Sequence, residues 1–269
     1  MIEFLKRHED YNLFLLNNFE NYGPQIGKAP YSGNFKLIYH QGEIIGVFCL
    51  TKNGILLFQA PSEEPIFERI LDGCLEEKIP IKGLIGDWNI SALFWEYLKE
   101  KKVIQKETSI SKEVLYRTDL LKSGFTPHPN TRLLAESDYP IWKPMRLDFL
   151  KEKGIPNHLN ENEMWESFRE KVTKKIAWGL FVDGNLVSVA DLTAKVLGMG
   201  QLGNVYTIPS MRRQGHSRAV METILFDLKN LHNMHKLIIF TEENCLAPQK
   251  LYESLGAERI GYFAMLFGS

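Results

Sequence analysis

The sequence contains little cysteine. Its three cysteines, Cys49, Cys74 and Cys245, are an odd number, lie far apart and never form a CxxC pair. Such a set argues against a disulfide framework and against a zinc site, because both need matched pairs or clusters of cysteine. We therefore expect ordinary thiols and no bound metal.

The chain also lacks an excess of charge and a long apolar run. Lys and Arg number 32 against 33 Asp and Glu, a formal net charge of -1, so no overall basic field would attract nucleic acid or anionic lipid. No apolar stretch approaches the roughly 20 residues that span a membrane. Residues 1–12 mix both charge signs, unlike a signal peptide. We expect a cytoplasmic monomer or homodimer with no nucleic-acid or membrane partner.

Apolar residues are plentiful and fall into short runs. They make up 44% of the 269 residues, enough for two domains that each bury a core. Residues 36–60 contain three runs rich in Ile, Val, Leu and Phe, separated by turns at Gln41-Gly42 and Asn53-Gly54. These signals predict an antiparallel meander, followed by a helix, the short strand "IKGLIG" and a second helix.

The same order of predicted elements returns in the second half. Residues 176–208 contain three predicted strands with an Asp183-Gly184 hairpin, and a helix over about 215–231 follows. The apolar run "LIIF", a helix that ends at Gly256 and the strand "RIGYFAMLF" complete the chain. Two halves with one order of elements predict an internal duplication and an α/β fold with a mixed sheet.

A short spacing pattern supports the duplication. The pattern N-x-x-A-x-x-x-x-Y begins at Asn89 and again at Asn244, each time soon after an apolar strand. Between the halves, "LLKSGFTPHPNTR" contains Gly and Pro without periodicity, which is typical of a linker. The predicted domains are therefore residues 1–125 and 126–269. The second domain begins with two predicted helices, over about 137–153 and 161–174.

A positively charged turn precedes the helix expected to begin near Gly215. The strand "NVYTI" is followed by "PSMRRQG", which contains Arg212 and Arg213. Arginines at a helix N-terminus oppose the helix dipole, so we infer that an anion compensates them, bound by backbone N–H groups of residues 213–218. A pyrophosphate fits a cradle of this length. The phosphate motifs GxxxxGK[ST] and GxGxxG are both absent.

The pattern that remains is R-x-x-G-x-S, from Arg212 to Ser217. It resembles the [RQ]-x-x-G-x-[GA] acyl-CoA signature of the GCN5-related N-acetyltransferases, the GNAT family, with Ser217 in place of Gly or Ala. "GNVYTIPSMRRQGHSRAVMETIL" looks like that family's fourth strand, pyrophosphate loop and following helix. "FTEENCLAPQKLYESLGAERIG" looks like its fifth strand, asparagine turn, tyrosine-bearing helix and final strand. The resemblance implies the acyl-CoA N-acyltransferase (GNAT) fold in the second domain and a degenerate GNAT-like repeat in the first.

The resemblance also implies a reaction. Acetyl-CoA would be the acyl donor, and a primary amine of a small molecule, amino acid derivative or peptide would attack its thioester directly. A backbone N–H of Val205, Tyr206 or Thr207 would polarise the carbonyl group, Tyr252 would protonate the departing thiolate, and Asn244 would adjoin the cofactor. The residues expected at its phosphate groups are Arg212, Arg213, Gln214, Gly215, His216, Ser217 and Arg218.

Two of these assignments have structural alternatives. Tyr252 lies on a short amphipathic helix, where an aromatic residue can simply belong to the core. Asn244 precedes the same helix and can cap it.

The general base is not evident from the sequence. The predicted fourth strand carries Gln201 and no carboxylate. Asp191, in the otherwise apolar strand "LVSVADLTA", is the first candidate, because an acid at the centre of a strand needs a partner or a raised pKa. It could equally lie on a solvated face of the sheet. The other candidates are Glu242, Glu243 and water.

Other functions also fit parts of the sequence. A noncatalytic acyl-CoA-binding or sensing protein would explain the missing glutamate, and an aminoacyl-tRNA-dependent transferase would suit tandem GNAT-like domains, although the near-neutral charge opposes it. The first half carries Glu63 and Glu64 where the cradle would be, so it should not bind coenzyme A. Acidic residues around Glu161 and Glu242 are the only hint about the acceptor and favour a cation.

Overall fold

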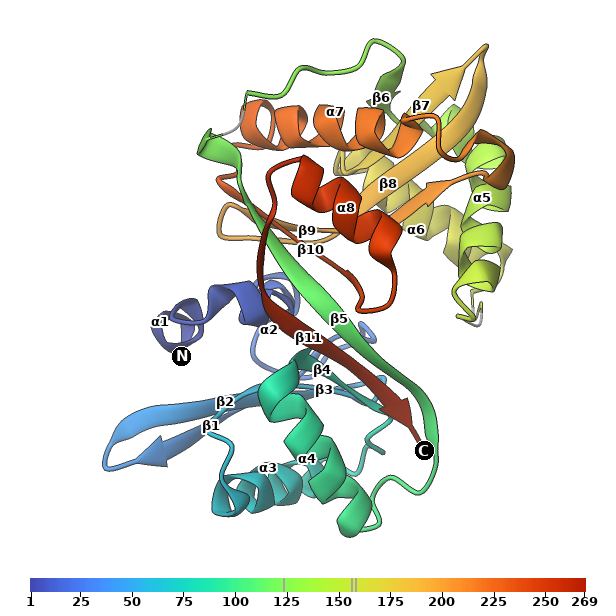
Figure 1. Cartoon of the computed structure of the whole chain (residues 1–269). Helices are drawn as coiled ribbons and strands as arrows, with labels where there is room; N and C mark the ends of the chain where they lie inside the picture. The colour runs from blue at the N-terminus through green and yellow to red at the C-terminus, as the bar shows by residue number, and fades with distance from the viewer. Residues whose placement is uncertain (123, 156, 158) are drawn as a thin grey trace. The chain divides into compact units, whose positions relative to one another are not determined.

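The computed structural model describes residues 1–122, 124–155, 157 and 159–269 (Figure 1). The chain divides into two compact units. Unit 1 comprises Met1–Arg117 and Phe240–Ser269, and unit 2 comprises Thr118–Ile239. Both units mix helices with strands, so the α/β class predicted from the sequence is confirmed.

Unit 1 is built on a mixed sheet with the strand order β1-β2-β3-β4-β11-β5. The expected meander is present, because β2 pairs antiparallel with both β1 and β3, whereas β3 pairs parallel with β4. The strands are β1 (Gly33–His40), β2 (Glu43–Thr51), β3 (Ile55–Gln59), β4 (Gly83–Asp87), β5 (Glu107–Asp119) and β11 (Glu258–Gly268). The helices are α1 (Ile2–Lys6), α2 (Glu9–Tyr22), α3 (Glu64–Glu76), α4 (Trp88–Glu100) and α8 (Leu246–Ser254).

The sheet of unit 2 has the strand order β6-β7-β8-β9-β10, and only the last pair is parallel. Its strands are β6 (Thr131–Leu133), β7 (Ala177–Val182), β8 (Asn185–Val196), β9 (Met199–Thr207) and β10 (Lys236–Glu242), the last of which ends in unit 1. The α-helices are α5 (Tyr139–Glu152), α6 (Glu161–Thr173) and α7 (His216–Asn230). Short 3-10 helices are η1 (Leu120–Lys122), η2 (Glu136–Asp138) and η3 (Pro209–Met211).

Helices cover both faces of the unit 2 sheet. Trp142 of α5 and Phe168 of α6 are buried against one face, where Val189 of β8 belongs to the same core cluster. On the other face, Trp178 of β7 donates a hydrogen bond of 2.8 Å from Nε1 to Asp227 of α7. The two layers of side chains hold β8 and β9, the strands that lead to the candidate site, in a packed core.

The order of elements in the first half returns in the second. The series β1-β2-β3-α3-β4-α4-β5 is matched by β7-β8-β9-α7-β10-α8-β11, with a parallel pair at β3–β4 and again at β9–β10. The N-x-x-A-x-x-x-x-Y pattern is less well matched, because Asn89 lies inside the first turn of α4 whereas Asn244 precedes α8. A duplication explains the shared order, and it stays a hypothesis.

The last strand of the chain pairs with strands that come from the first half of the sequence. β11 lies between β4 and β5 and pairs antiparallel with each of them. Residues 240–269 therefore belong to unit 1, although the sequence boundary assigns them to the domain 126–269. The compact units and the predicted domains 1–125 and 126–269 differ in this segment, and the domain boundary itself stays a prediction.

A bidentate ion pair fixes the start of the helical part of unit 2. Arg132 donates to both carboxylate oxygens of Asp138, at 2.7 and 2.9 Å, and the backbone N–H of Ala135 donates to Asp138 Oδ2 at 2.8 Å. The hydrogen bonds from Arg132 hold the pKa of Asp138 below its ordinary value. A carboxyl with a lowered pKa stabilises the fold above its unfolded-state pKa of about 4, and this contribution is lost as pH falls through the folded-state value.

We expect Asp138→Asn to lower the free energy of unfolding by about 1–3 kcal/mol at pH 7, because a charge-assisted bidentate contact is lost. Urea unfolding between pH 7 and pH 3 measures the difference, which should shrink below pH 4. Asp183→Asn, in the exposed β7–β8 turn, is the matched control and should change little. A difference for Asp138→Asn that stays constant with pH would contradict this account.

Among the residues that the structure describes, no helix is both long enough and apolar enough to cross a bilayer.

Candidate functional site

The turn between β9 and α7 ends at a glycine that could admit a ligand. Gly215 is the N-cap residue of α7 and has a φ of 83°, in the left-handed region that glycine tolerates best. A Cβ atom placed on Gly215 would meet nothing within 4 Å. Because Gly215 has no side chain to cap the helix, open space adjoins the first-turn backbone N–H groups of α7, which is the arrangement that binds anions.

Arg212 fastens this turn to its surroundings. Its Nε donates to the carbonyl oxygen of Thr207 at 2.9 Å, and its Nη2 lies 2.5 Å from a carboxylate oxygen of Glu152 at the end of α5. The guanidinium also lies 5.4 Å from the ring centre of Tyr206. The hydrogen bond with Glu152 raises the pKa of Arg212, so its charge is retained at any working pH. Arg212 therefore joins the turn to β9 and to α5.

The other residues predicted at the phosphates share this turn and the first helical turn. Arg213 has a φ of 61° and is exposed, as are Gln214 and Arg218. Gln214 donates to the carbonyl oxygen of Ser210 at 3.3 Å, and Arg218 pairs with Glu222 at 2.9 Å. The seven predicted phosphate-site residues thus occupy the turn and the first turn of α7, and no hydrogen bond or ion pair to a described residue engages the Arg213 side chain.

The side-chain Nε2 of His216, the first residue of α7, is buried. This nitrogen has no hydrogen-bond partner among the described residues. An unpartnered buried nitrogen at the edge of an open helix N-terminus fits a site that a polar ligand completes.

Ser217 occupies the position where the sequence departs from the family signature. Its hydroxyl lies 2.8 Å from that of Thr207, which lies 2.7 Å from the hydroxyl of Ser188. Ser188 donates its one hydroxyl proton to the carbonyl oxygen of Tyr206. The hydroxyl of Thr207 must therefore donate to Ser188, and that of Ser217 must donate to Thr207. Ser217 therefore ties α7 to the end of β9, and its proton is not available to a phosphate.

The end of β9 directs some of its backbone groups away from the sheet. The parallel register with β10 ends at the pair Leu202–Ile239, well before β9 ends at Thr207. On the other edge, the N–H of Ile208 donates to the carbonyl oxygen of Val187 at 3.1 Å, so residues 206 and 208 face β8. Because directions alternate along a strand, the backbone groups of Val205 and Thr207 point away from β8. Of the three predicted donors, Tyr206 is thus the one directed into the β8–β9 ladder.

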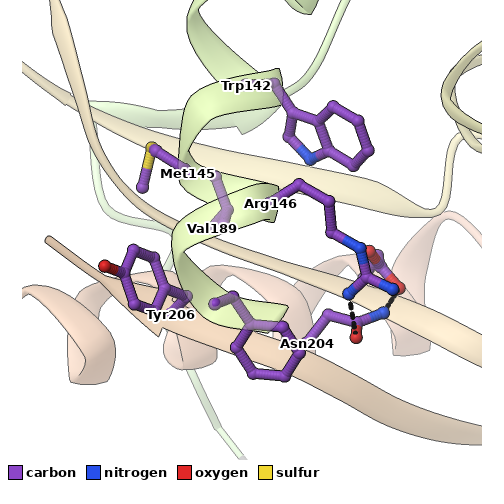
Figure 2. A pocket seen from close by; sticks show the side chains of 8 residues that line it. Trp142, Met145, Arg146, Val189, Asn204 and Tyr206 are labelled. Atoms are coloured by element: carbon purple, nitrogen blue, oxygen red, sulfur yellow. Dashed lines mark hydrogen bonds between the residues drawn. The ribbon is translucent and has the colours of Figure 1, made fainter. Parts of the chain in front are cut away.

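A small pocket lies beside this part of β9 (Figure 2). Its walls come from one helix, α5, and from the two strands β8 and β9, and they combine aromatic side chains with an acid, an amide and a guanidinium. The lining residues are Trp142, Met145, Arg146, Phe149, Val189, Asp191, Asn204 and Tyr206.

Asp191 is buried in this pocket, with 3% of its surface exposed, so the alternative of a solvated sheet face is wrong. Its Oδ1 lies 2.7 Å from Nζ of Lys171 and accepts a hydrogen bond of 2.8 Å from Nδ2 of Asn204. The Oδ1 of Asn204 in turn accepts a hydrogen bond of 2.6 Å from Arg146 (Figure 2). We call Lys171, Asp191, Asn204 and Arg146 the polar array.

The sequence indicates one member of the polar array, Asp191, and not the other three. Lys171 and Arg146 look like ordinary helix-surface residues in the sequence, since only the fold turns Lys171 toward β8 and Arg146 toward β9. Asn204 carried a usable signal, because asparagine is unfavourable inside a strand but tolerates left-handed backbone. Its φ is 52°.

Tyr252 and Asn244, the two other predicted site residues, lie in unit 1. Tyr252 is 5% exposed and its ring centre lies 5.7 Å from that of Tyr116. Burial raises the pKa of Tyr252 well above its ordinary value, so the phenol is protonated at neutral pH. Tyr252 is thus a buried residue whose hydroxyl keeps its proton, and its role as an acid stays a prediction.

Asn244 is exposed in the turn before α8 and does not cap that helix, whose N-cap is Cys245 without a side-chain hydrogen bond. The turn is held by Gln249 of α8 instead, which donates from Nε2 to the carbonyl oxygen of Glu243 at 2.8 Å. The carboxylate of Glu243 pairs with Lys112 at 3.2 Å, and hydrogen bonds from Tyr262 and Lys112 lower the pKa of Glu243. These contacts keep Glu243 ionised.

The acidic residue expected near the acceptor in unit 2 is already paired. Glu161 contacts Lys143 and accepts a hydrogen bond of 3.0 Å from the hydroxyl of Tyr139. Its charge is therefore partly neutralised within the protein. Within the described ranges, no group of three or more His, Cys, Asp or Glu side chains is arranged to hold a metal ion.

Comparison with known proteins yields one family and many similar folds. Residues 142–257 match the model described as "Acetyltransferase (GNAT) family". A GNAT-family acetyltransferase from Colwellia psychrerythraea has a similar structure, with a TM-score of 0.58, 14% identity, and coverage of 100% of this chain and 97% of that one. A Drosophila protein superposes with a TM-score of 0.65 and 13% identity, covering 98% of this chain and 93% of its own.

A third similar structure is the GCN5-related N-acetyltransferase from Sphaerobacter thermophilus, with a TM-score of 0.58, 11% identity, and coverage of 84% and 76%. At these sequence identities the similarity to the solved structures shows a shared fold and nothing further. No curated protein matches the sequence.

Proposed function

Because residues 142–257 belong to the acetyltransferase (GNAT) family by their match to its model, we propose that this protein binds acetyl-CoA and transfers its acetyl group to a primary amine. The observation that carries the proposal is the open N-terminus of α7 at Gly215, flanked by Arg212 and Arg213. Bound there, acetyl-CoA would supply a thioester as the acyl donor.

Each residue of the turn has a distinct part in this proposal. The backbone N–H groups at the start of α7 bind the pyrophosphate, and Gly215 allows its oxygens to approach closely. Arg213 is an exposed cation next to them, and His216 offers its Nε2, which has no partner among the described residues. Arg212 acts indirectly, because its hydrogen bonds to Thr207 and Glu152 stabilise the conformation of the turn.

The backbone of β9 supplies the donors for the carbonyl group. The N–H groups of Val205 and Thr207 point away from β8, toward the side on which β9 has left its register with β10. Fixed N–H donors stabilise the negative charge that develops on a carbonyl oxygen during attack by an amine. The charge needs no side chain here, because the strand itself presents the donors.

The acceptor amine attacks the thioester from beside these donors. A primary amine attacks only in its neutral form, since the ammonium ion has no lone pair. The amine loses one proton and the thiolate gains one as the C–S bond breaks and the C–N bond forms. Tyr252 is the proposed proton donor to the thiolate.

Binding of acetyl-CoA is tested by thermal shift on a matched pair of glycine variants. Saturating acetyl-CoA should raise the Tm of the wild-type protein by on the order of 5 °C, as expected for a ligand present at about 100 times its Kd. Gly215→Glu should lose this shift, because its carboxylate would fill the cradle and repel phosphate. Gly184→Glu is the control, since Gly184 also has a positive φ, of 78°, and open space around it.

Both glycine variants incur the same backbone strain, so only the site differs between them. A wild-type Tm that saturating acetyl-CoA does not move would refute the cofactor assignment. Equal loss of the shift in the two variants would mean that strain, not the cradle, is responsible.

A noncatalytic acyl-CoA-binding protein is the second candidate, favoured by the absence of a carboxylate on β9 and by the pairing of Asp191 with Lys171. It predicts the same thermal shift without release of coenzyme A when a broad panel of amines is added.

A further inference from the structure

The strand β9 contains an extra residue at Asn204. On β8 one residue separates the partners Val189 and Asp191, whereas on β9 two residues separate their counterparts Tyr206 and Gly203. The extra residue makes a β-bulge, and Asn204 adopts a φ of 52° within it. Such a conformation is usual for glycine and tolerated by asparagine.

The bulge determines which way the following backbone groups point. A shift of one residue reverses the direction of every later N–H and C=O group in a strand. With the bulge in place, Ile208 donates to Val187 of β8, and the N–H groups of Val205 and Thr207 face outward. In a regular register continued from Gly203, Val205 instead of Tyr206 would lie opposite Val189, and its N–H would point into β8 rather than toward a ligand.

The side chain of Asn204 is held at both ends. Its Nδ2 donates to Asp191 and its Oδ1 accepts from Arg146, so the amide has one orientation only. Asp191 is itself held by Lys171, and the side chains of this pair are 5% and 19% exposed. Through the polar array, side chains from α5, α6 and β8 thus fix Asn204, the residue at the bulge.

A second set of contacts fixes the far end of the same segment. Thr207 is bonded through its carbonyl oxygen to Arg212 and through its hydroxyl to Ser188 and Ser217. Residues 205 and 206 therefore lie between two anchored positions, 204 and 207. Preorganised donors stabilise a transition state because they need no reorganisation as charge develops.

We infer that Asn204 is a positioning residue that aims the Val205 N–H, and that Asp191 acts through Asn204 rather than by taking a proton from the amine. The inference rests on the proposed acetyl transfer, because the Val205 N–H then faces the thioester carbonyl. It changes the expected role of Asp191 from a general base to an anchor. The carboxylate oxygen that bonds Asn204 is also the one that pairs with Lys171, so it is doubly engaged.

The test compares kcat, KM and acetyl-CoA affinity in full-length variants, with coenzyme A release as the readout. Asn204→Gly keeps the left-handed backbone available but removes the amide, and should lower kcat about 10-fold while the Kd for acetyl-CoA stays within about 3-fold. Asn204→Val, whose branched side chain resists positive φ, should lower kcat further. Asn233→Gly is the matched control, because Asn233 has a φ of 52° outside β9.

A double-mutant cycle separates an anchor from a base. If Asp191 acts through Asn204, Asp191→Asn should also lower kcat about 10-fold, and the double variant with Asn204→Gly should be no slower than either single variant. The shape of the pH–rate profile should stay that of the wild type. A double variant whose loss of kcat is the product of the two single losses would overturn the inference. So would a pH–rate profile of Asp191→Asn that no longer falls at acidic pH, or a wild-type kcat in Asn204→Gly.

A second measurement does not depend on turnover. Hydrogen exchange of the amides of residues 205–207 should accelerate in Asn204→Gly and Asp191→Asn, and should match the wild type in Asn233→Gly. Unchanged exchange in both array variants overturns the inference. Absence of turnover in the wild type would refute the proposed function alone, since the exchange result still decides whether the polar array holds β9.

Discussion

Replacing Tyr252 with phenylalanine is expected to lower kcat for acetyl transfer by about 10²–10⁴-fold, the usual contribution of a positioned general acid. The structure makes this a clean substitution, because Tyr252 is buried and phenylalanine preserves its ring packing against Tyr116. The pKa of Tyr252 is raised by burial, so its proton is present throughout the working range and kcat should not fall on the alkaline side below pH 10.

Tyr116→Phe is the matched control for this prediction. Its hydroxyl belongs to the same pair of rings but donates to Glu253 at 2.9 Å, and burial together with that bond raises the pKa of Tyr116 to about 12. The control should keep kcat within about 3-fold. Steady-state release of coenzyme A measures both variants, and thermal shift with acetyl-CoA checks that binding is retained. A Tyr252→Phe protein with wild-type kcat would remove Tyr252 from the mechanism and leave only its structural role.

Lys171→Met is expected to destabilise the protein by about 3 kcal/mol, because it leaves the buried carboxylate of Asp191 without its countercharge. Lys171 and Asp191 lie 2.7 Å apart, with side chains 19% and 5% exposed. Urea unfolding of the full chain measures the loss. Adding Asp191→Asn to Lys171→Met should restore part of the lost stability, since the unpaired charge is then gone.

Lys174→Met controls for the loss of a lysine in the same segment. Lys174 directly follows α6 and pairs with Glu170 at 2.6 Å, but these side chains are 51% and 63% exposed. An exposed pair contributes at most about 1 kcal/mol, because solvent screens it. Similar losses in the Lys171 and Lys174 variants would contradict a buried role for the Lys171–Asp191 pair and would weaken the polar array as a device for holding β9.

Local signals in the sequence predicted the individual elements well. The helix expected over 215–231 is α7 at His216–Asn230, and those expected over 137–153 and 161–174 are α5 and α6. The Asp183-Gly184 turn joins β7 and β8, with φ angles of 48° and 78°. Such features depend on turn chemistry and apolar spacing over a few residues, which a sequence carries in full.

Contacts between distant segments were the part that could not be predicted. Nothing local in "RIGYFAMLF" indicates that β11 pairs with β4 and β5 rather than with the strands of its own half, because all these strands offer similar apolar faces. In the same way, "LVSVADLTA" shows an acid in a strand but not the lysine from α6 and the asparagine from β9 that engage it.

The sequence by itself determined the element order and the GNAT resemblance, and it predicted an anion site at the turn "RRQGHS", since each signal lies within a short stretch of chain. Only the tertiary structure decided that Asp191 is buried and paired, that Ser217 bonds Thr207, and that β9 bulges at Asn204. These features depend on side chains from separate elements meeting in one place, and chain folding alone brings them together.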